Sequence, residues 1–73
     1  MKVYIVIQTE EYESGFTIHK VCSSKELALK VIEGIITSDI WKDDGWEYNS
    51  FAENWISERG NRLEIEECEL LEE

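Results

Sequence analysis

His19 and Cys22 are the one histidine–cysteine pair that lies close together in this sequence, and such a pair can act as a nucleophile and its general base. They belong to a segment, Phe16 to Cys22, whose residues favour a β-strand. Successive side chains of a strand point to opposite faces, so residues an odd number apart face away from each other. We therefore expect an exposed His19, a packed Cys22 and no catalytic dyad, unless a bulge changes the alternation.

Metal ligands do not form a complete set. Two cysteines and one histidine cannot fill the four positions of a structural zinc site within one chain. An EF-hand calcium loop with Gly45 at its sixth position would place Ile40 at the first, where an acidic or amide ligand is needed. The four glycines are isolated and form no phosphate-binding loop.

We predict a protein that is not an enzyme and that uses no metal or cofactor.

Acidic residues are concentrated in the second half of the chain. Residues 39–73 contain twelve Asp and Glu against three basic residues, a net charge of −9, whereas residues 1–38 sum to −1. Such an imbalance bears on partners and association rates rather than on fold. We expect a basic protein partner and no direct binding of nucleic acid, because this surface repels phosphates. The alternative is that the charge serves only solubility.

Aromatic residues are interleaved with acids between Trp41 and Trp55. One interpretation is a second, smaller core. The other is that Trp41 or Trp46, beside an Asp-Gly turn, stays exposed as an anchor, since Trp is enriched in interface hot spots. The candidate partner-binding residues are Asp39, Trp41, Asp43, Asp44, Trp46, Glu47, Glu64 and Glu66.

The first elements are a pair of strands. Lys2 to Gln8 is apolar on both faces, as in a central strand, and Thr9 to Gly15 suits a hairpin connection to a second strand, Phe16 to Cys22. We expect the two strands to be antiparallel.

A long helix should follow. Ser23 and Glu26 have the spacing of a capping box, and pairs of apolar residues then recur every four positions until about Ser38. Gly34 inside this helix predicts a close approach to the sheet backbone, because glycine otherwise costs about 1 kcal/mol relative to alanine.

The second half predicts a turn at residues 43–45, a short helix and a last strand. Ser50 and Glu53 repeat the capping-box spacing, which favours a helix from about Ser50 to Arg59, ended by Gly60. Arg62 to Leu71 alternates as a strand does, but Cys68 and Leu70 change the phase, which predicts a bulge near residues 66–67 or fraying beyond it.

These elements predict one α+β domain over residues 1–73. The order is β-β-α-α-β: a three-stranded antiparallel sheet, with the last strand beside the first, and one long and one short helix packed on one face. The uncovered face would bear Tyr4 and Val6. A chain this short buries only about 60% of its unfolded surface, so a deep active-site cleft is not expected.

The chain shows no secretion signal and no stretch of apolar residues long enough to cross a membrane, so we expect a cytoplasmic protein of a bacterial cell that does not bind membranes. In a reducing compartment, Cys22 and Cys68 are expected to be thiols, although a disulfide between them stays an alternative.

The spacing of the last strand allows a sharper hypothesis. Glu64 and Glu66 would stand roughly 7 Å apart on one face, about half the linear density of phosphates along a DNA strand. Acids from the segment between Asp39 and Glu58 would have to supply a parallel row. Together the two rows could imitate DNA to a basic cleft.

A resemblance points the same way. The opening MKVYIVIQ, the helix SSKELALKVIEGI and the ending IEECEL resemble small uncharacterised proteins of phages and other mobile elements of bacteria. In size and charge the chain also resembles phage host-takeover proteins that mimic DNA, including inhibitors of HU-type nucleoid proteins. This second resemblance is one of class and implies an inhibitor that occupies the DNA-binding surface of a host protein with its carboxylates.

Three functions from different classes follow. The first is a non-enzymatic, phage-type protein that binds and inhibits a basic host protein, with a DNA-binding protein as the expected target. The second is a structural or regulatory module that forms a homodimer through the edge or the uncovered face of its sheet. The third is an enzyme or a protein that sequesters a small ligand.

Overall fold

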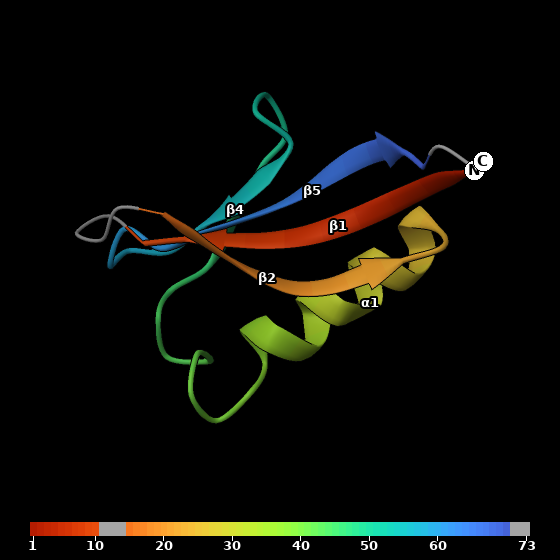
Figure 1. Ribbon diagram of the computed structural model, residues 1–73. Coiled ribbons are helices and arrows are strands. Elements are labelled where there is room, and N and C mark those ends of the chain that lie inside the picture. The colour runs from red at the N-terminus through yellow and green to blue at the C-terminus, as the bar shows by residue number, and fades with distance from the viewer. Residues whose placement is uncertain (11–14, 71–73) are drawn as a thin grey trace.

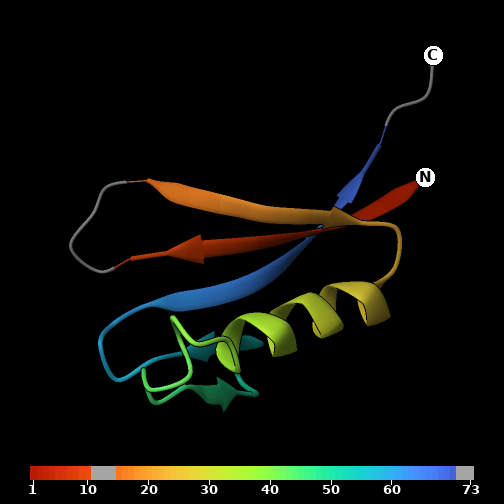
Figure 2. The ribbon, with the colours of Figure 1, turned by 90° about the horizontal axis from the view of Figure 1, so that it is seen from below.

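Five strands and one helix follow one another in residues 1–10 and 15–70, which the computed structural model describes (Figure 1). They are β1 (Lys2–Thr9), β2 (Phe16–Cys22), α1 (Lys25–Ile36), β3 (Glu47–Asn49), β4 (Asn54–Ile56) and β5 (Arg62–Glu69). The strands form one antiparallel sheet in the order β2-β1-β5-β4-β3. α1 lies across one face of this sheet (Figures 1 and 2).

The first two strands pair as the sequence predicts. β1 is antiparallel to β2 on one side and to β5 on the other, so the last strand does lie beside the first (Figure 2). β1 therefore lies between β2 and β5, which agrees with its apolar side chains on both faces. Part of the predicted hairpin connection, residues 11–14, lies outside the described residues.

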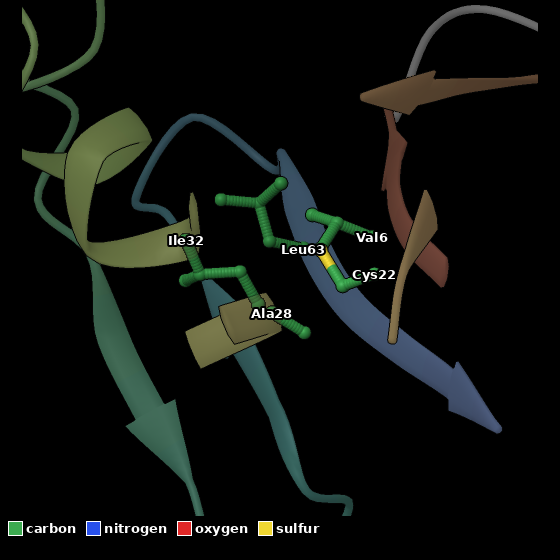
Figure 3. Close-up of a cluster of buried hydrophobic side chains, with 5 residues drawn as sticks. All are labelled: Val6, Cys22, Ala28, Ile32 and Leu63. Carbon is green, nitrogen blue, oxygen red and sulfur yellow. The ribbon is translucent and has the colours of Figure 1, made fainter. Parts of the chain in front are cut away.

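The predicted long helix is confirmed, with a shift of one residue at its start. Ser24, rather than Ser23, is the N-cap: its hydroxyl Oγ accepts a hydrogen bond from the backbone N–H of Leu27 at 3.2 Å. Ala28 and Ile32 are fully buried against Val6 and Leu63 of the sheet (Figure 3).

The prediction of a three-stranded sheet with two helices is wrong. The segment expected to form a second helix instead forms the hairpin of β3 and β4, so the sheet has five strands and α1 is the only helix among the described residues. The carboxamide Oδ1 of Asn49 accepts hydrogen bonds from the backbone N–H groups of Phe51 and Ala52 at 3.0 and 3.2 Å and thereby builds the turn.

The helical periodicity of this segment has another cause. Tyr48 and Trp55 pair across the two strands, with ring centroids 4.8 Å apart. Phe51, which would have completed the helical stripe, lies in the turn and is 99% exposed. Apolar residues at positions 48, 51 and 55 thus fit a helix by spacing, although only two of them touch.

The two faces of β1 are the reverse of the prediction. Tyr4 and Val6 face α1, since Val6 is in the buried core and Tyr4 packs against it. The uncovered face, here called the open face, bears Val3, Ile5 and Ile7.

The predicted bulge near residues 66–67 is also wrong. β5 keeps a regular register with β1 from Arg62 to Glu69. The irregularity lies in β2 instead: Val6 is opposite Lys20, whereas Ile7 is opposite Ile18, which leaves His19 as an extra residue. Cys68 consequently lies on the open face, where the regular alternation of β5 places it.

Gly34 does not approach the sheet, contrary to the prediction. It is exposed, and a Cβ atom built at this position would meet no atom within 4 Å. The turn at residues 43–45 is confirmed, and Gly45 is required there: it has a φ of 72°, and a Cβ atom would lie 2.8 Å from Cγ of Glu58.

Candidate protein-binding face

The open face divides into two parts, set by the register of the strands. Residues directly opposite each other on paired strands point to the same side of the sheet. Side chains from β1 and β2 form what we call the apolar half: Val3, Ile5, Ile7, Phe16, Ile18 and Val21. Side chains from β5 and the β3 edge form the acidic half: Glu47, Glu64 and Glu66.

The apolar half is largely open to solvent at the edge strand. Phe16, Ile18 and Val21 are 66%, 53% and 58% exposed. They are neighbours on one strand. The half-buried Val3 and Ile5 of β1 continue the apolar surface inward, while Ile7 is buried. Contiguous exposed apolar surface of this kind marks interaction sites. Sequence reasoning missed these three residues, because the sequence does not tell which face of β2 the helix covers.

The acidic half has carboxylates with no ion pair among the residues the structure describes. Glu64 and Glu66 lie opposite Ile7 and Ile5, so each carboxylate stands beside an apolar side chain of β1. Glu47 lies on β3, beyond β4, and is exposed. Arg62 lies on the same face but forms no ion pair with these carboxylates in the part of the chain that the structure describes, so they are available to a basic partner.

The other acids of β5 point to the opposite side. Glu67 and Glu69 share the α1 side of the sheet, and each has a cation nearby. Lys2 Nζ lies 3.1 Å from Glu67 Oε1, and the N-terminal ammonium lies 3.5 Å from Glu69 Oε1. The hydrogen bond from Lys2 to Glu67 raises the pKa of the Lys2 ammonium above 10.5.

Asp44 is built into the fold. Its side chain is only 5% exposed, and its Oδ2 accepts a hydrogen bond from Asn61 Nδ2 at 2.7 Å. Its Oδ1 lies 3.5 Å from Arg59 Nε, and its backbone oxygen accepts from the N–H of Glu58 at 3.0 Å. Asp44 therefore joins the segment after α1 to the turn between β4 and β5, and it is not part of the open face.

The remaining predicted site residues also lie in the segment between α1 and β3. Asp39 is exposed and pairs with Lys42 at 3.3 Å, and Asp43 is exposed. Trp41 and Trp46 are half-buried: the indole Nε1 of Trp46 donates to the backbone oxygen of Trp41 at 2.9 Å, and the Trp46 ring packs against the core. The predicted site thus separates into the acidic half and this connecting segment.

The bulge in β2 puts the side chains of His19 and Cys22 on the same side of the sheet, whereas regular alternation would put them on opposite sides. Both side chains lie on the α1 side, but His19 Nε2 is 2.6 Å from Oε1 of Gln8, which is buried there. Cys22 is buried in the core, and both cysteines are free thiols. The polar partner of His19 is thus Gln8 rather than Cys22.

Within residues 1–10 and 15–70, no group of three His, Cys, Asp or Glu side chains is arranged to hold a metal ion. Over the same residues, no helix has the length and apolar character needed to cross a membrane.

Comparison with known proteins gives one match. The model of a family described as a domain of unknown function, DUF7336, matches residues 1–73. No curated protein and no solved structure matches the chain.

Proposed function

This chain belongs to the DUF7336 family of unknown function, and we propose that it is a non-enzymatic protein that binds a basic partner protein through its open face. The observation that carries the proposal is that the apolar and acidic halves adjoin along the pairing of β1 with β5. A complementary partner presents apolar side chains with a row of Lys or Arg beside them. The apolar contact contributes affinity, and the charges contribute orientation and association rate.

Charge favours a basic partner over a second copy of the chain. Each molecule carries a net charge of −10, and among the described residues the open face has three carboxylates without an ion pair and one arginine, Arg62. Two copies stacked by this face would bring these carboxylates together. A basic partner would instead be attracted by these carboxylates. This attraction is screened over about 8 Å at physiological ionic strength.

Inhibition of a DNA-binding protein, the function that the phage-type resemblance implies, is the finer form of this proposal. In its favour, Glu64 and Glu66 form an unpaired row on one face. The parallel row comes only from Glu47, two strands or about 10 Å away, because Asp39, Asp43 and Asp44 lie outside the sheet. The density of charge is thus below that of DNA, and the apolar half has no counterpart in a phosphate backbone. DNA mimicry stays a prediction.

Two matched variants test the proposal. Glu64→Gln/Glu66→Gln removes two charges from the open face, and Glu67→Gln/Glu69→Gln removes two from the other side of the same strand. Each variant and the parent are immobilised and exposed to a bacterial lysate, and captured proteins are identified by mass spectrometry. We expect a basic protein that the first variant loses and the second retains.

Equal loss with both variants would mean that bulk charge, not the open face, attracts the partner. For the captured protein, displacement by duplex DNA supports inhibition at its DNA-binding surface. If DNA does not compete while the variants behave as expected, the open face binds a basic protein elsewhere and DNA mimicry is wrong.

A homodimer is the second candidate, and the unpaired outer edge of β2 favours it. Two features of that edge oppose strand pairing: the bulge at His19 and the neighbouring Lys20. Light scattering at low and high salt distinguishes the candidates, since the proposal expects a monomer at both. A dimer abolished by Val21→Lys would assign the apolar half to self-association instead.

A further inference from the structure

We propose that a pocket on the α1 side of the sheet binds an organic cation that carries N-methyl groups. The pocket has a volume of about 170 Å³ and lies between the first half of α1 and the β3–β4 hairpin. It is separate from the open face, so this inference goes beyond the proposed function and does not depend on it.

Three aromatic rings line the pocket. They come from Tyr4 on β1, Trp55 on β4 and Tyr48 on β3, and Ile65 and Leu29 complete the apolar lining. β1, β5, β4 and β3 are consecutive in the sheet, so these side chains spread across four strands on one face. α1 contributes only Lys25 and Leu29 to this lining. Of the three rings, Tyr48 is 54% exposed, and Tyr4 and Trp55 are half-buried.

The rings of Tyr48 and Trp55 are tilted rather than stacked. Their centroids are 4.8 Å apart and their planes meet at 54°. At this angle the two rings do not cover each other face to face, and both line the pocket. Aromatic faces carry negative charge density and attract a cation within about 6 Å of the ring centre, most strongly for Trp.

Carboxylates complete the site. Glu53 and Glu67 line the same pocket. Glu67 is neutralised by Lys2, whereas Glu53 has no ion pair among the described residues. Glu53 is also the one described non-glycine residue with a positive φ, 54°. This conformation is common at the end of a short hairpin loop and places Glu53 at the rim of the pocket.

Lys25 is the one cation in the lining and decides between classes of ligand. It is exposed on the first turn of α1, where a long side chain can turn toward solvent. An anionic ligand would use Lys25, while a cationic ligand would be opposed by it. The rings and the unpaired carboxylate outnumber this single ammonium, and they favour a cation.

N-methylated cations fit these walls better than a bare ammonium or a metal ion. Methyl groups weaken the hydration of the ammonium charge, so removing its water costs less free energy. Aromatic cages that bind choline and methylated lysine use the same effect. The ligand class is therefore a trimethylammonium group or a methylated lysine side chain.

Choline and its uncharged isostere, 3,3-dimethylbutan-1-ol, test the inference in one experiment. Each is titrated into the ¹⁵N-labelled protein, and the indole N–H signal of Trp55 is followed by NMR after assignment with Trp55→Phe. We expect choline to shift this signal and to bind at least about threefold more tightly than the isostere. Equal affinity would show a merely apolar cavity, and an unmoved Trp55 signal would overturn the inference.

Variants of the residues that line the pocket test whether the bound ligand is a cation or an anion. Glu53→Gln and Tyr48→Leu should each weaken choline binding by about threefold or more, and Lys25→Met should strengthen it. Trp41→Phe, outside the pocket, is the control and should leave it unchanged. Weaker binding with Lys25→Met would point to an anionic ligand and contradict the proposal. Glu64→Gln/Glu66→Gln should not alter choline binding, so failure of this site and failure of the open face are distinguishable.

Discussion

Glu64 of β5 and Ile7 of β1 lie directly opposite each other on the sheet face that α1 leaves uncovered. This pairing places a carboxylate with no ion pair among the described residues next to an apolar side chain. It is the point at which the acidic and apolar halves of the open face meet. The proposed partner has to satisfy both halves at once, and this gives the first prediction.

Ile18→Asp should abolish capture of a basic partner without unfolding the protein. The side chain is 53% exposed, so the cost is confined to strand propensity and the pairing with Ile7, about 1 kcal/mol of the free energy of unfolding. Phe51→Asp is the matched control, because Phe51 is 99% exposed but lies in the β3–β4 turn. Capture by pull-down and urea denaturation of both variants check this, and equal loss of capture would contradict it.

Gly34→Ala should raise the free energy of unfolding by up to about 1 kcal/mol, because the helix gains propensity and the new methyl group meets no neighbour. Gly45→Ala should lower it, since Gly45 has a positive φ and its Cβ would crowd Glu58. Urea denaturation of the two variants measures both changes. A destabilised Gly34→Ala protein would indicate a contact at this position that the monomer lacks.

Asp44→Ala should lower the free energy of unfolding by about 1–3 kcal/mol, because it leaves the side-chain N–H of Asn61 without its acceptor. Asp43→Ala removes the same charge from an exposed neighbour and should change little. A double-mutant cycle with Asn61→Ala isolates the pair. Additive effects in that cycle would show that the hydrogen bond does not hold the two segments together.

Stability should fall slightly in strongly alkaline solution through Lys2. Its pKa in the folded protein is raised by Glu67, so the contribution is fully present below the unfolded pKa near 10.5 and is lost as pH rises through the higher folded value. The group is fully exposed, so the effect is small. Comparing urea midpoints of the parent and Glu67→Gln across this range checks it: the difference between the two should disappear at the alkaline end.

Strong, long patterns in the sequence predicted the first half of the fold. The β1–β2 hairpin and α1 follow from an apolar strand, a helical stripe and a capping serine. The face of β1 could not be predicted, because both of its faces carry large apolar or aromatic side chains, and only packing with α1 distinguishes them. The prediction of a bulge in β5 failed for a similar reason. Cys68 was expected on the same side of the sheet as Leu63 and Ile65, but it lies on the open face in a regular strand.

The second half was harder, because its strands are only three residues long. Tyr48, Phe51 and Trp55 match a helical period, and a pair of three-residue strands leaves little alternation to oppose it. The positive φ of Glu53 and the turn at Asn49 are decided by tertiary context. Of the candidate site, Glu64 and Glu66 could be placed on one face by alternation, but their apolar neighbours on β1 required the register.

The place of Leu63 in the core has a consequence for the order in which the fold can form. This side chain is fully buried, and it comes from β5, which follows β1 and β4 in the chain but lies between them in the sheet. Before β5 is inserted, β1, β2 and the amphipathic helix have apolar surfaces with no complete cover. Closing the core therefore depends on contacts between residues far apart in the sequence, which form slowly, and the unfinished state is prone to aggregation.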